Sequence, residues 1–285
     1  MTEKARGPRG KPRRERLDRL LVERGLARSR ERAQALVLAG VVRVDGRPAG
    51  KAGTLVPTAS VLTVAAEDHP YVGRGGLKLR AALESFAIDP RDKVALDVGA
   101  STGGFTDCML QSGARKVYAL DVGVGQLDWS LRCDPRVVVL EGRNARYLEA
   151  GDLPERVDLA TVDVSFISLG KILPSLPPVL LPGAAVVTLV KPQFEVGRGE
   201  VGRGGIVRDR EQHEAVLTRV AGAALAAGFV VIGACASPIT GMEGNREFFL
   251  HLTLAAATAP GLDEAARAEL FGAITDAGDG AAGTN

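Results

Sequence analysis

Residues 95–110 read ALDVGASTGGFTDCML, and this stretch decides the fold of most of the chain. An apolar run ends at Asp97, glycines follow at 99, 103 and 104, and the next apolar segment has the length of a short helix. A strand, a glycine-rich turn and a helix in this order form the nucleotide-binding unit of open α/β sheets. The stretch therefore predicts an α/β sheet with a nucleotide-like ligand at this loop.

The spacing of the glycines decides between the possible ligands. A P-loop ends in Lys followed by Ser or Thr, and residues 99–107 contain no Lys. The dinucleotide fingerprint requires G-x-G-x-x-G, which this spacing does not match. The pattern D-x-G-x-x-x-G-G-F instead resembles motif I of S-adenosylmethionine methyltransferases, in which glycines allow close backbone approach to the methionine moiety. The resemblance implies S-adenosyl-L-methionine as cofactor, with contacts from Asp97, Gly99, Ser101, Gly103, Gly104 and Phe105.

From about residue 91 onward, apolar strand-like runs alternate with helical segments. This alternation predicts an α/β sheet that is covered by helices on both faces. Seven strands suit the Rossmann-like methyltransferase fold, whose final strand typically inserts antiparallel to the others. The expected strands are 93–98, 116–121, 136–140, 157–163, 184–190, 229–235 and 247–254. The expected helices are 77–87, 103–113, 126–132, 168–180 and 210–227, with a weak one at 262–274.

Polar residues stand at the ends of three of these strands. Asp121 ends the second strand, 22 residues after Gly99, where a carboxylate can accept hydrogen bonds from ribose hydroxyls. Asn144 follows the third strand and Asp163 ends the fourth. Because ligands in such sheets bind at the carboxyl ends of the strands, we expect all three side chains at the cofactor, with Asn144 near the adenine.

Cysteine usage and hydropathy bound the class of protein. No apolar stretch reaches the roughly 18 residues of a membrane helix, and residues 1–16 contain no hydrophobic run. Cys108, Cys133 and Cys235 fit neither a disulfide framework nor metal-ligand spacing. We therefore expect a reduced, cytoplasmic protein that has neither a metal ion nor a membrane as partner.

The charge of the chain is distributed unevenly. Residues 1–80 hold 18 Lys and Arg against 8 Asp and Glu, whereas residues 81–285 hold 18 against 26. Clustered basic residues gain free energy from phosphate contacts and counterion release, so the N-terminal part is expected to face nucleic acid.

Residues 16–64 have the pattern of a helix–helix–hairpin unit. Leucines at 17, 20 and 21 have helical spacing, Ser29 suits the N-cap of a second helix, and Asp45-Gly46 is a hairpin turn signal. The starting RLD, the SR before the second helix and the hairpin pattern G-x-V-x-V-D-G resemble the S4 RNA-binding domain. This resemblance implies RNA contacts from Arg16, Arg28, Arg30, Arg32 and Arg43.

These patterns divide the chain into five expected parts. They are a flexible basic tail over 1–15, an S4-like domain over 16–66, a linker over 67–76, a methyltransferase domain over 77–257 and a C-terminal tail over 258–285. His69 is expected to be a plain linker residue. The Gly- and Arg-rich segment 197–209 is either a loop that orders on RNA or a long flexible connection.

The identity of the methyl acceptor follows first by exclusion. Methylation of exocyclic base nitrogens usually uses Asp/Asn-Pro-Pro-Tyr/Phe at the fourth strand end, and residues 163–168 read DVSFIS, without proline. Methylation of cytosine C5 uses a cysteine nucleophile at the fourth or fifth strand end, and no cysteine stands there. Both base chemistries are therefore disfavoured.

Four ionisable residues indicate a different acceptor. Lys78, Asp163, Lys191 and Glu247 occur in an order that resembles the tetrad of the FtsJ-like RNA ribose 2′-O-methyltransferases. A ribose hydroxyl is a poor nucleophile, and a lysine can take its proton when burial and a second ammonium group depress the pKa of that lysine. We expect Lys191 to be this base, Asp163 and Glu247 to orient it, and Lys78 to position the substrate or tune Lys191.

The motifs RGGLKL, DVGASTGGFTD, DVSFISL, LVKPQFE and GNREFFL, following an S4 module, resemble the TlyA (hemolysin A) family over about residues 16–255. The resemblance implies 2′-O-methylation of cytidine in ribosomal RNA, with ribosomal subunits as partners. Three alternatives are an RNA-binding or ribosome-assembly factor without catalysis, a pore-forming hemolysin, and an S4-linked pseudouridine synthase. A pore former needs a membrane-inserting segment, and a pseudouridine synthase has no use for the cofactor loop.

Overall fold

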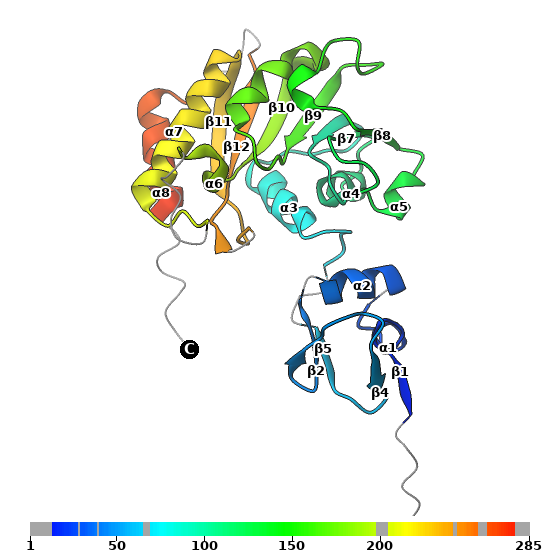
Figure 1. The fold of residues 1–285 in the computed structure, drawn as a ribbon. Helices are drawn as coiled ribbons and strands as arrows, with labels where there is room; N and C mark the ends of the chain where they lie inside the picture. Colours follow the sequence, from blue (N-terminus) through cyan, green and yellow to red (C-terminus); the bar gives the residue numbers. More distant parts are fainter. Residues whose placement is uncertain are drawn as a thin grey trace, which may run out of the picture. The chain divides into compact units, whose positions relative to one another are not determined.

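The structure, a computed structural model, describes residues 13–27, 29–38, 40–64, 69–197, 205–241, 244–255 and 261–276. The chain divides into two compact units, Met1–His69 and Pro70–Asn285 (Figure 1). Several expectations fall outside the described residues. They concern most of the basic tail, Arg28, residues 198–204 of the Gly- and Arg-rich segment and much of the C-terminal tail.

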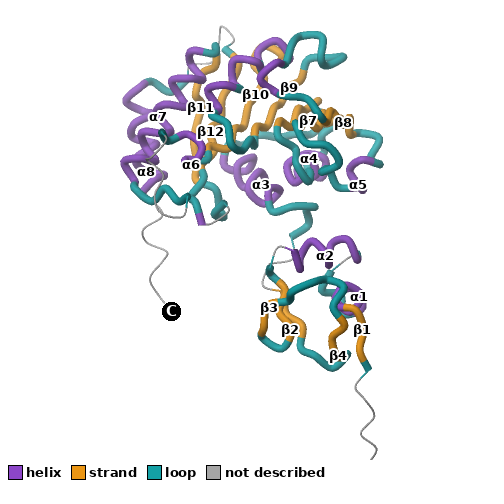
Figure 2. Tube along the Cα trace, in the orientation of Figure 1, coloured by secondary structure: helices purple, strands orange, loops and turns teal. Residues whose placement is uncertain are grey.

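The described residues of the first unit form two helices and five short strands (Figure 2), which enclose a small apolar core. Its elements are β1 (Arg14–Arg16), α1 (Leu17–Glu23), α2 (Arg30–Leu38), β2 (Val42–Val44), β3 (Arg47–Pro48), β4 (Leu55–Pro57) and β5 (Leu62–Val64). Ser29 caps α2, because its Oγ accepts from the Arg32 N–H at 3.1 Å. Asp45 and Gly46 both have positive φ and join β2 to β3, as the hairpin signal predicts. The expected helix–helix–hairpin pattern is thus confirmed.

The second unit is built on a seven-stranded sheet with the order β11-β12-β10-β9-β6-β7-β8. The strands are β6 (Val94–Val98), β7 (Lys116–Asp121), β8 (Val137–Glu141), β9 (Val157–Val162), β10 (Leu180–Val190), β11 (Phe229–Ala236) and β12 (Phe248–Leu254). β12 runs antiparallel to both neighbours, whereas β10, β9, β6, β7 and β8 are mutually parallel. The predicted α/β fold with an inserted antiparallel last strand is confirmed.

Helices cover both faces of this sheet (Figure 1). They are α3 (Gly75–Ser85), α4 (Gly104–Gln111), α5 (Trp129–Arg132), α6 (Pro192–Glu195), α7 (Arg210–Ala226) and α8 (Glu264–Asp276). Alternate residues of β6 face the two layers: Leu96 packs in the core that includes α7 and α8, and Ala95 packs in the core that includes α3, α4 and α5. The sheet is therefore buried on both sides, as expected.

One expected helix is wrong. Residues 168–180 form three short 3₁₀ turns, η2 (Leu169–Lys171), η3 (Leu173–Ser175) and η4 (Pro177–Val179), and not one α-helix. The apolar spacing is helical, but Pro174, Pro177 and Pro178 interrupt the backbone hydrogen bonds that a continuous helix needs. The turns still bury Leu169 and Leu173 against the sheet.

The strand order fixes where a ligand binds. β6 lies between β9 and β7, so the chain leaves the end of β6 on one side and returns to β9 on the other. Such a reversal opens a crevice at the carboxyl ends of the two central strands. Among the described residues, no helix is long and apolar enough to cross a membrane.

Candidate active site

The glycine-rich loop after β6 lies directly against the end of β9. The Asp163 N–H donates to the Val98 carbonyl at 2.8 Å, and Gly99 has a φ of +86°. A Cβ at Gly99 would collide with the Asp163 carbonyl oxygen. Glycine at this position therefore lets the loop and Asp163 share the same end of the sheet.

The second half of the loop serves helix packing. A Cβ at Gly104 would lie 3.0 Å from the Gly76 nitrogen and 3.2 Å from the Gly75 Cα. The start of α4 and the start of α3 thus approach each other through glycines, and α3 carries Lys78. Phe105 is buried against Phe249, with ring centroids 6.2 Å apart. Gly104 and Phe105 support the loop from behind and do not line the cavity described next.

A cavity of about 470 Å³ lies at the ends of the central strands. Five of the predicted cofactor residues line it: Gly99, Ser101, Asp121, Asn144 and Asp163. Apolar side chains, among them Val122 and Ile172, form other parts of its wall. This combination of a few polar groups and an apolar wall is typical of a small-molecule site.

Asp121 is held rigidly at this cavity. Its Oδ2 accepts from the Ser101 N–H at 2.8 Å, and its Oδ1 accepts from the Gly123 N–H at 2.7 Å. Each carboxylate oxygen has a second lone pair, so both can still accept from a ligand. The side-chain oxygen of Asn144 accepts from the Arg146 N–H at 3.1 Å. The side-chain N–H groups of Asn144 therefore point away from Arg146.

Asp97 is a predicted cofactor residue that is fully buried and, like Gly104 and Phe105, does not line the cavity. Thr106 on α4 donates to it at 2.7 Å and Thr161 on β9 donates at 3.0 Å. Burial raises the pKa of this carboxyl to about 7. The side chain thus joins β6, α4 and β9 beneath the loop. Gly103, with a φ of +97°, is likewise packed against Leu131.

The four predicted catalytic residues form two lysine–carboxylate pairs. Lys191 Nζ lies 2.6 Å from Asp163 Oδ1 and donates to Ser165 Oγ at 2.9 Å. Lys78 Nζ lies 2.5 Å from Glu247 Oε2. Each lysine side chain is 12% exposed, and Glu247 is 3% exposed. Charged groups at this depth are tolerated because each has an opposite charge as partner.

Sheet register explains why these pairs occur together. Val190 of β10 pairs with Phe248 of β12. Lys191 follows Val190 and Glu247 precedes Phe248, so both lie at the same edge of the sheet. β9 lies on the other side of β10 and ends just before Asp163. The ionisable residues therefore gather at the end of the sheet that also holds the cavity.

Aromatic residues at the cavity rim were not predicted. Phe166 is 89% exposed, has a φ of +64°, and lines the cavity. Its ring centroid lies 4.9 Å from that of Phe194. An exposed aromatic side chain in a rare backbone conformation is costly, and such features concentrate at functional sites. The sequence signal was the phenylalanine in each of the motifs DVSFISL and LVKPQFE.

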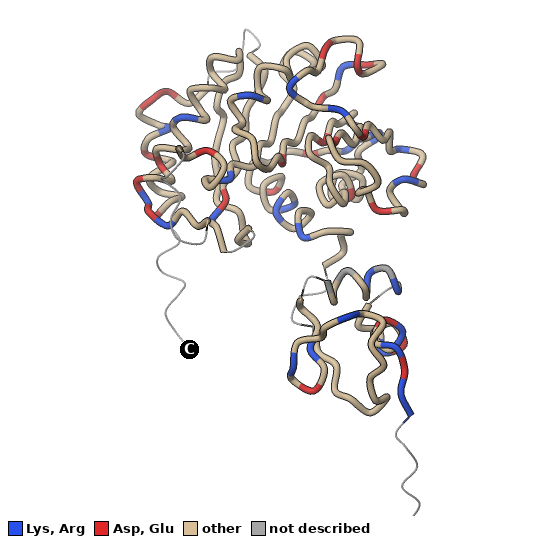
Figure 3. The backbone as a smooth tube through the Cα atoms, viewed as in Figure 1, with Lys and Arg blue, Asp and Glu red and all other residues tan. Residues whose placement is uncertain are grey.

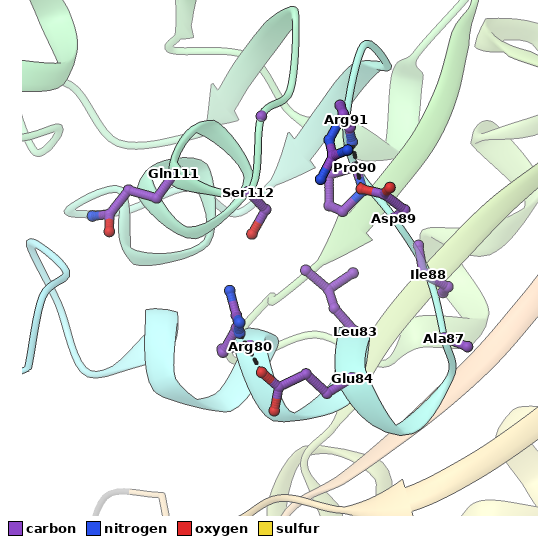
Figure 4. Close-up of a pocket in the computed structure, with 11 residues that line it drawn as sticks. Arg80, Leu83, Glu84, Ala87, Ile88, Asp89, Pro90, Arg91, Gln111 and Ser112 are labelled. Atoms are coloured by element: carbon purple, nitrogen blue, oxygen red, sulfur yellow. Dashed lines mark hydrogen bonds and ion pairs between the residues drawn. The ribbon is translucent and has the colours of Figure 1, made fainter.

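A second depression, of about 520 Å³, lies between the end of α3, the turn 87–91 and the end of α4 (Figure 4). Arg80 and Glu84 form an ion pair within α3 at 2.5 Å on its wall. None of the predicted site residues that the structure describes lines this depression. We therefore assign the site to the strand ends. In the described ranges, no three or more His, Cys, Asp or Glu gather as metal ligands.

The predicted RNA-binding arginines belong to the first unit, in which basic residues recur along β1 and α2 (Figure 3). Arg16 and Arg30 converge on Asp18, at 2.8 and 3.3 Å, and remain about half exposed. Arg32 contacts His69 at 3.2 Å, so His69 is a buried partner and not a plain linker residue. Arg43 is exposed on β2.

The comparisons with known proteins agree with this architecture. Residues 71–254 match the FtsJ-like methyltransferase family, and residues 15–61 match the S4 domain. The 16S/23S rRNA (cytidine-2′-O)-methyltransferase TlyA of Mycobacterium tuberculosis is 50% identical over 257 residues, which cover 89% of this chain and 96% of the relative. Hemolysin A of Brachyspira hyodysenteriae is 42% identical over 84% of this chain and 100% of its own length.

A solved structure extends the agreement to three dimensions. A protein from Streptococcus thermophilus that is named as a hemolysin matches with a TM-score of 0.72 and 44% sequence identity. The match covers 94% of this chain and 97% of that protein. The sheet order, the two lysine–carboxylate pairs and these relatives lead to one conclusion. The chain is an FtsJ-like methyltransferase with an S4 domain and belongs to the TlyA (hemolysin A) family.

Proposed function

We propose that this protein transfers the methyl group of S-adenosyl-L-methionine to the ribose 2′-hydroxyl of a cytidine in ribosomal RNA. The observation that carries the proposal is the position of Lys191: its Nζ is paired with Asp163 and donates to Ser165, and both of these partners line the cavity. The names of the TlyA relatives support the choice of cytidine and ribosomal RNA. Such a substrate implies that the protein works in the cytoplasm, on ribosomal subunits or their RNA.

The cavity suits the proposed cofactor. Asp121 offers carboxylate lone pairs for two ribose hydroxyls, and Val122 and Ile172 offer apolar surface for an adenine ring. Gly99 presents backbone without a side chain, which suits the methionine moiety. When bound, S-adenosylmethionine supplies an electrophilic methyl group on a sulfonium.

Lys191 is the proposed general base. In the proposed step the oxygen of the ribose 2′-hydroxyl would form a bond to the methyl carbon as the methyl–sulfur bond breaks, which leaves S-adenosylhomocysteine as the thioether product. The proton of the hydroxyl would pass to the unprotonated form of Lys191 Nζ. Asp163 and Ser165 contact this nitrogen at 2.6 and 2.9 Å. The two contacts fix the direction in which Nζ can form a further hydrogen bond. Proton transfer by a positioned group contributes about 10²–10⁴-fold in rate, and alignment of the reacting atoms adds to it.

The Lys78–Glu247 pair and the two phenylalanines Phe166 and Phe194 are the residues proposed to bind the methyl acceptor. Glu247 fixes Lys78, whose ammonium can hold the ribose or a phosphate beside it. Phe166, which is exposed and in ring contact with the half-buried Phe194, offers an aromatic face on which an unstacked base can lie. The S4 domain, proposed to span 16–66, contributes phosphate contacts through Arg16, Arg30 and their neighbours.

Ribose methylation in cells tests this function. Ribosomal RNA from a strain that lacks the protein is mapped by mass spectrometry beside RNA from a complemented strain. We expect at least one 2′-O-methylcytidine to disappear and to return on complementation, but not on complementation with Lys191→Ala. An unchanged map of ribose methylation would contradict the proposed function.

A further inference from the structure

Glu195 is a buried acid with no part in the chemistry described above. It is the last residue of α6, four residues after Lys191, and is only 7% exposed. Both of its carboxylate oxygens are used. Oε2 accepts from Ser168 Oγ at 2.7 Å, and Oε1 accepts from the Leu169 N–H at 2.7 Å. A buried carboxylate is retained where its hydrogen bonds have a specific use.

These bonds join the two loops that carry the proposed base and its partner. The loop after β9 carries Asp163, Ser165 and Phe166, and the segment after β10, which begins with Lys191 and continues as α6, carries Phe194. On the cavity side, the loops meet through the Lys191 contacts and the Phe166–Phe194 ring contact. The bonds of Glu195 form a second layer of contact between the same two loops, away from solvent.

The bonds also fix where the first loop ends. Ser168 Oγ accepts from the Gly170 N–H at 3.2 Å while it donates to Glu195, and this caps the turn η2. At the other end, Arg219 of α7 donates to the Glu195 carbonyl at 2.6 Å. Glu195 is thus anchored to a long helix, and residues 165–167 are held between β9 and a capped turn. Burial raises the pKa of Glu195, which its two donors counteract.

We propose that Glu195 is a positioning residue that sets the place of Ser165 and Phe166 relative to Lys191. Without its carboxylate, the buried Leu169 N–H has lost its acceptor, and the loop must shift to satisfy it. A shift of this loop moves two contacts of Lys191 and one wall of the cavity together. This role rests on the proposed function, because it acts through Lys191.

The test combines turnover with a measurement that needs no turnover. For Glu195→Ala we expect kcat on ribosomal RNA to fall about 30-fold, with little change in the KM for RNA, because misplacement by about 1 Å costs on this scale. Glu195→Gln keeps one carbonyl acceptor and should recover most of the loss. Ser168→Ala removes one of the same bonds, and the loss of kcat in its combination with Glu195→Ala should therefore be smaller than the product of the two single losses.

Hydrogen exchange measured by mass spectrometry gives the second readout. In Glu195→Ala, the amides of 164–171 should exchange faster, whereas those of β9 and β10 keep their protection. Glu155→Gln is the matched control: Glu155 accepts from Lys116 and Tyr118 just before β9 begins, at the opposite end of the strand, so kcat and exchange at 164–171 should not change.

The possible outcomes separate the two proposals. Unchanged exchange at 164–171, or a kcat of Glu195→Ala within twofold of the unmodified protein, overturns the role of Glu195. An unmodified protein that methylates no RNA overturns the proposed function, and the exchange result then still decides whether Glu195 holds the loop.

Discussion

Each unit of the protein contains an aspartate that is completely buried, and the two aspartates behave in opposite ways. Asp18 in the S4 unit accepts from Arg16, Arg30 and Gln34, and these partners hold the pKa of its carboxyl well below its usual range. Asp97 in the methyltransferase unit has only threonine hydroxyls as side-chain donors, and burial raises its pKa to about 7. The pKa values of the two buried carboxyl groups are thus shifted in opposite directions, because Asp18 has charged hydrogen-bond donors and Asp97 has none.

The opposite pKa shifts of Asp18 and Asp97 correspond to different roles of charged side chains in the two units. In the S4 unit a buried negative charge orients arginines that stay half exposed, where they can meet phosphates. In the methyltransferase unit the hydroxyl network holds the glycine-rich loop after β6 in place. Fixed charges there are concentrated in the pairs Lys191–Asp163 and Lys78–Glu247 at the strand ends.

Replacement of Lys191 should give the largest effect of any change considered. Lys191→Ala is expected to lower methyl transfer by about 10³-fold or more, because a positioned base contributes on this scale. The affinity for S-adenosylmethionine should stay within about threefold, since the residues proposed to contact the adenosine belong to other strands. Single-turnover kinetics and calorimetric titration measure the two quantities. Substantial remaining turnover would show that the base is another group.

Asp97→Asn should change how stability depends on pH. The raised pKa of Asp97 means that the folded protein keeps a proton that the unfolded chain releases above about pH 4. As pH rises from about 4 to about 7, the free energy of unfolding should therefore fall relative to that of Asp97→Asn. The expected change is on the order of 3 kcal/mol. Urea denaturation at several pH values measures it, and parallel pH profiles of the two proteins would contradict the assignment.

Asp18→Asn tests the opposite case. The lowered pKa of Asp18 stabilises the fold above the pKa of the unfolded chain, and this stabilisation is lost as pH falls. At neutral pH the substitution should therefore destabilise the S4 unit by about 1–2 kcal/mol, and the difference should shrink below about pH 4. Hydrogen exchange of 14–38 reports on this unit, with the β6 and β9 amides as internal control. Faster exchange in β6 and β9 as well would mean that the effect is not confined to the S4 unit.

Arg30→Gln should have the smallest effect. We expect RNA affinity to fall about three- to fivefold, and the slope of log affinity against log salt to decrease by slightly less than one, because one phosphate contact is lost. The control is Arg24→Gln, since Arg24 donates to the Ser60 and Thr58 carbonyls within the unit. Equal losses of affinity in both variants would mean that the fold of the unit, and not a phosphate contact, is affected.

The sequence was sufficient to predict the elements whose apolar runs are long. All seven strands of the large sheet were predicted within a few residues, and the register then brings Asp163, Lys191 and Glu247 to one edge. The helix expected at 168–180 failed because helical apolar spacing was given more weight than three prolines.

Other features depend on contacts between distant segments. Gly104 follows the cofactor pattern, yet its contact is with Gly75 and Gly76 of α3, which no spacing rule connects to it. Asp97 stands at the end of an apolar run, where a ligand-binding residue is expected. In the structure its carboxylate is buried and accepts a hydrogen bond from Thr161 on β9. The role of Glu195 has no signal in the sequence, because its partners lie 26 and 27 residues earlier in the chain.

A direct assay of the product tests the central claim. The protein is incubated with methyl-labelled S-adenosylmethionine and purified ribosomal subunits, and the RNA is digested to nucleosides and separated. We predict label in 2′-O-methylcytidine for the unmodified protein and none for Lys191→Ala, although that variant still binds the cofactor. Label on a base, or no label in the RNA of either subunit from a protein that binds the cofactor, would contradict the account.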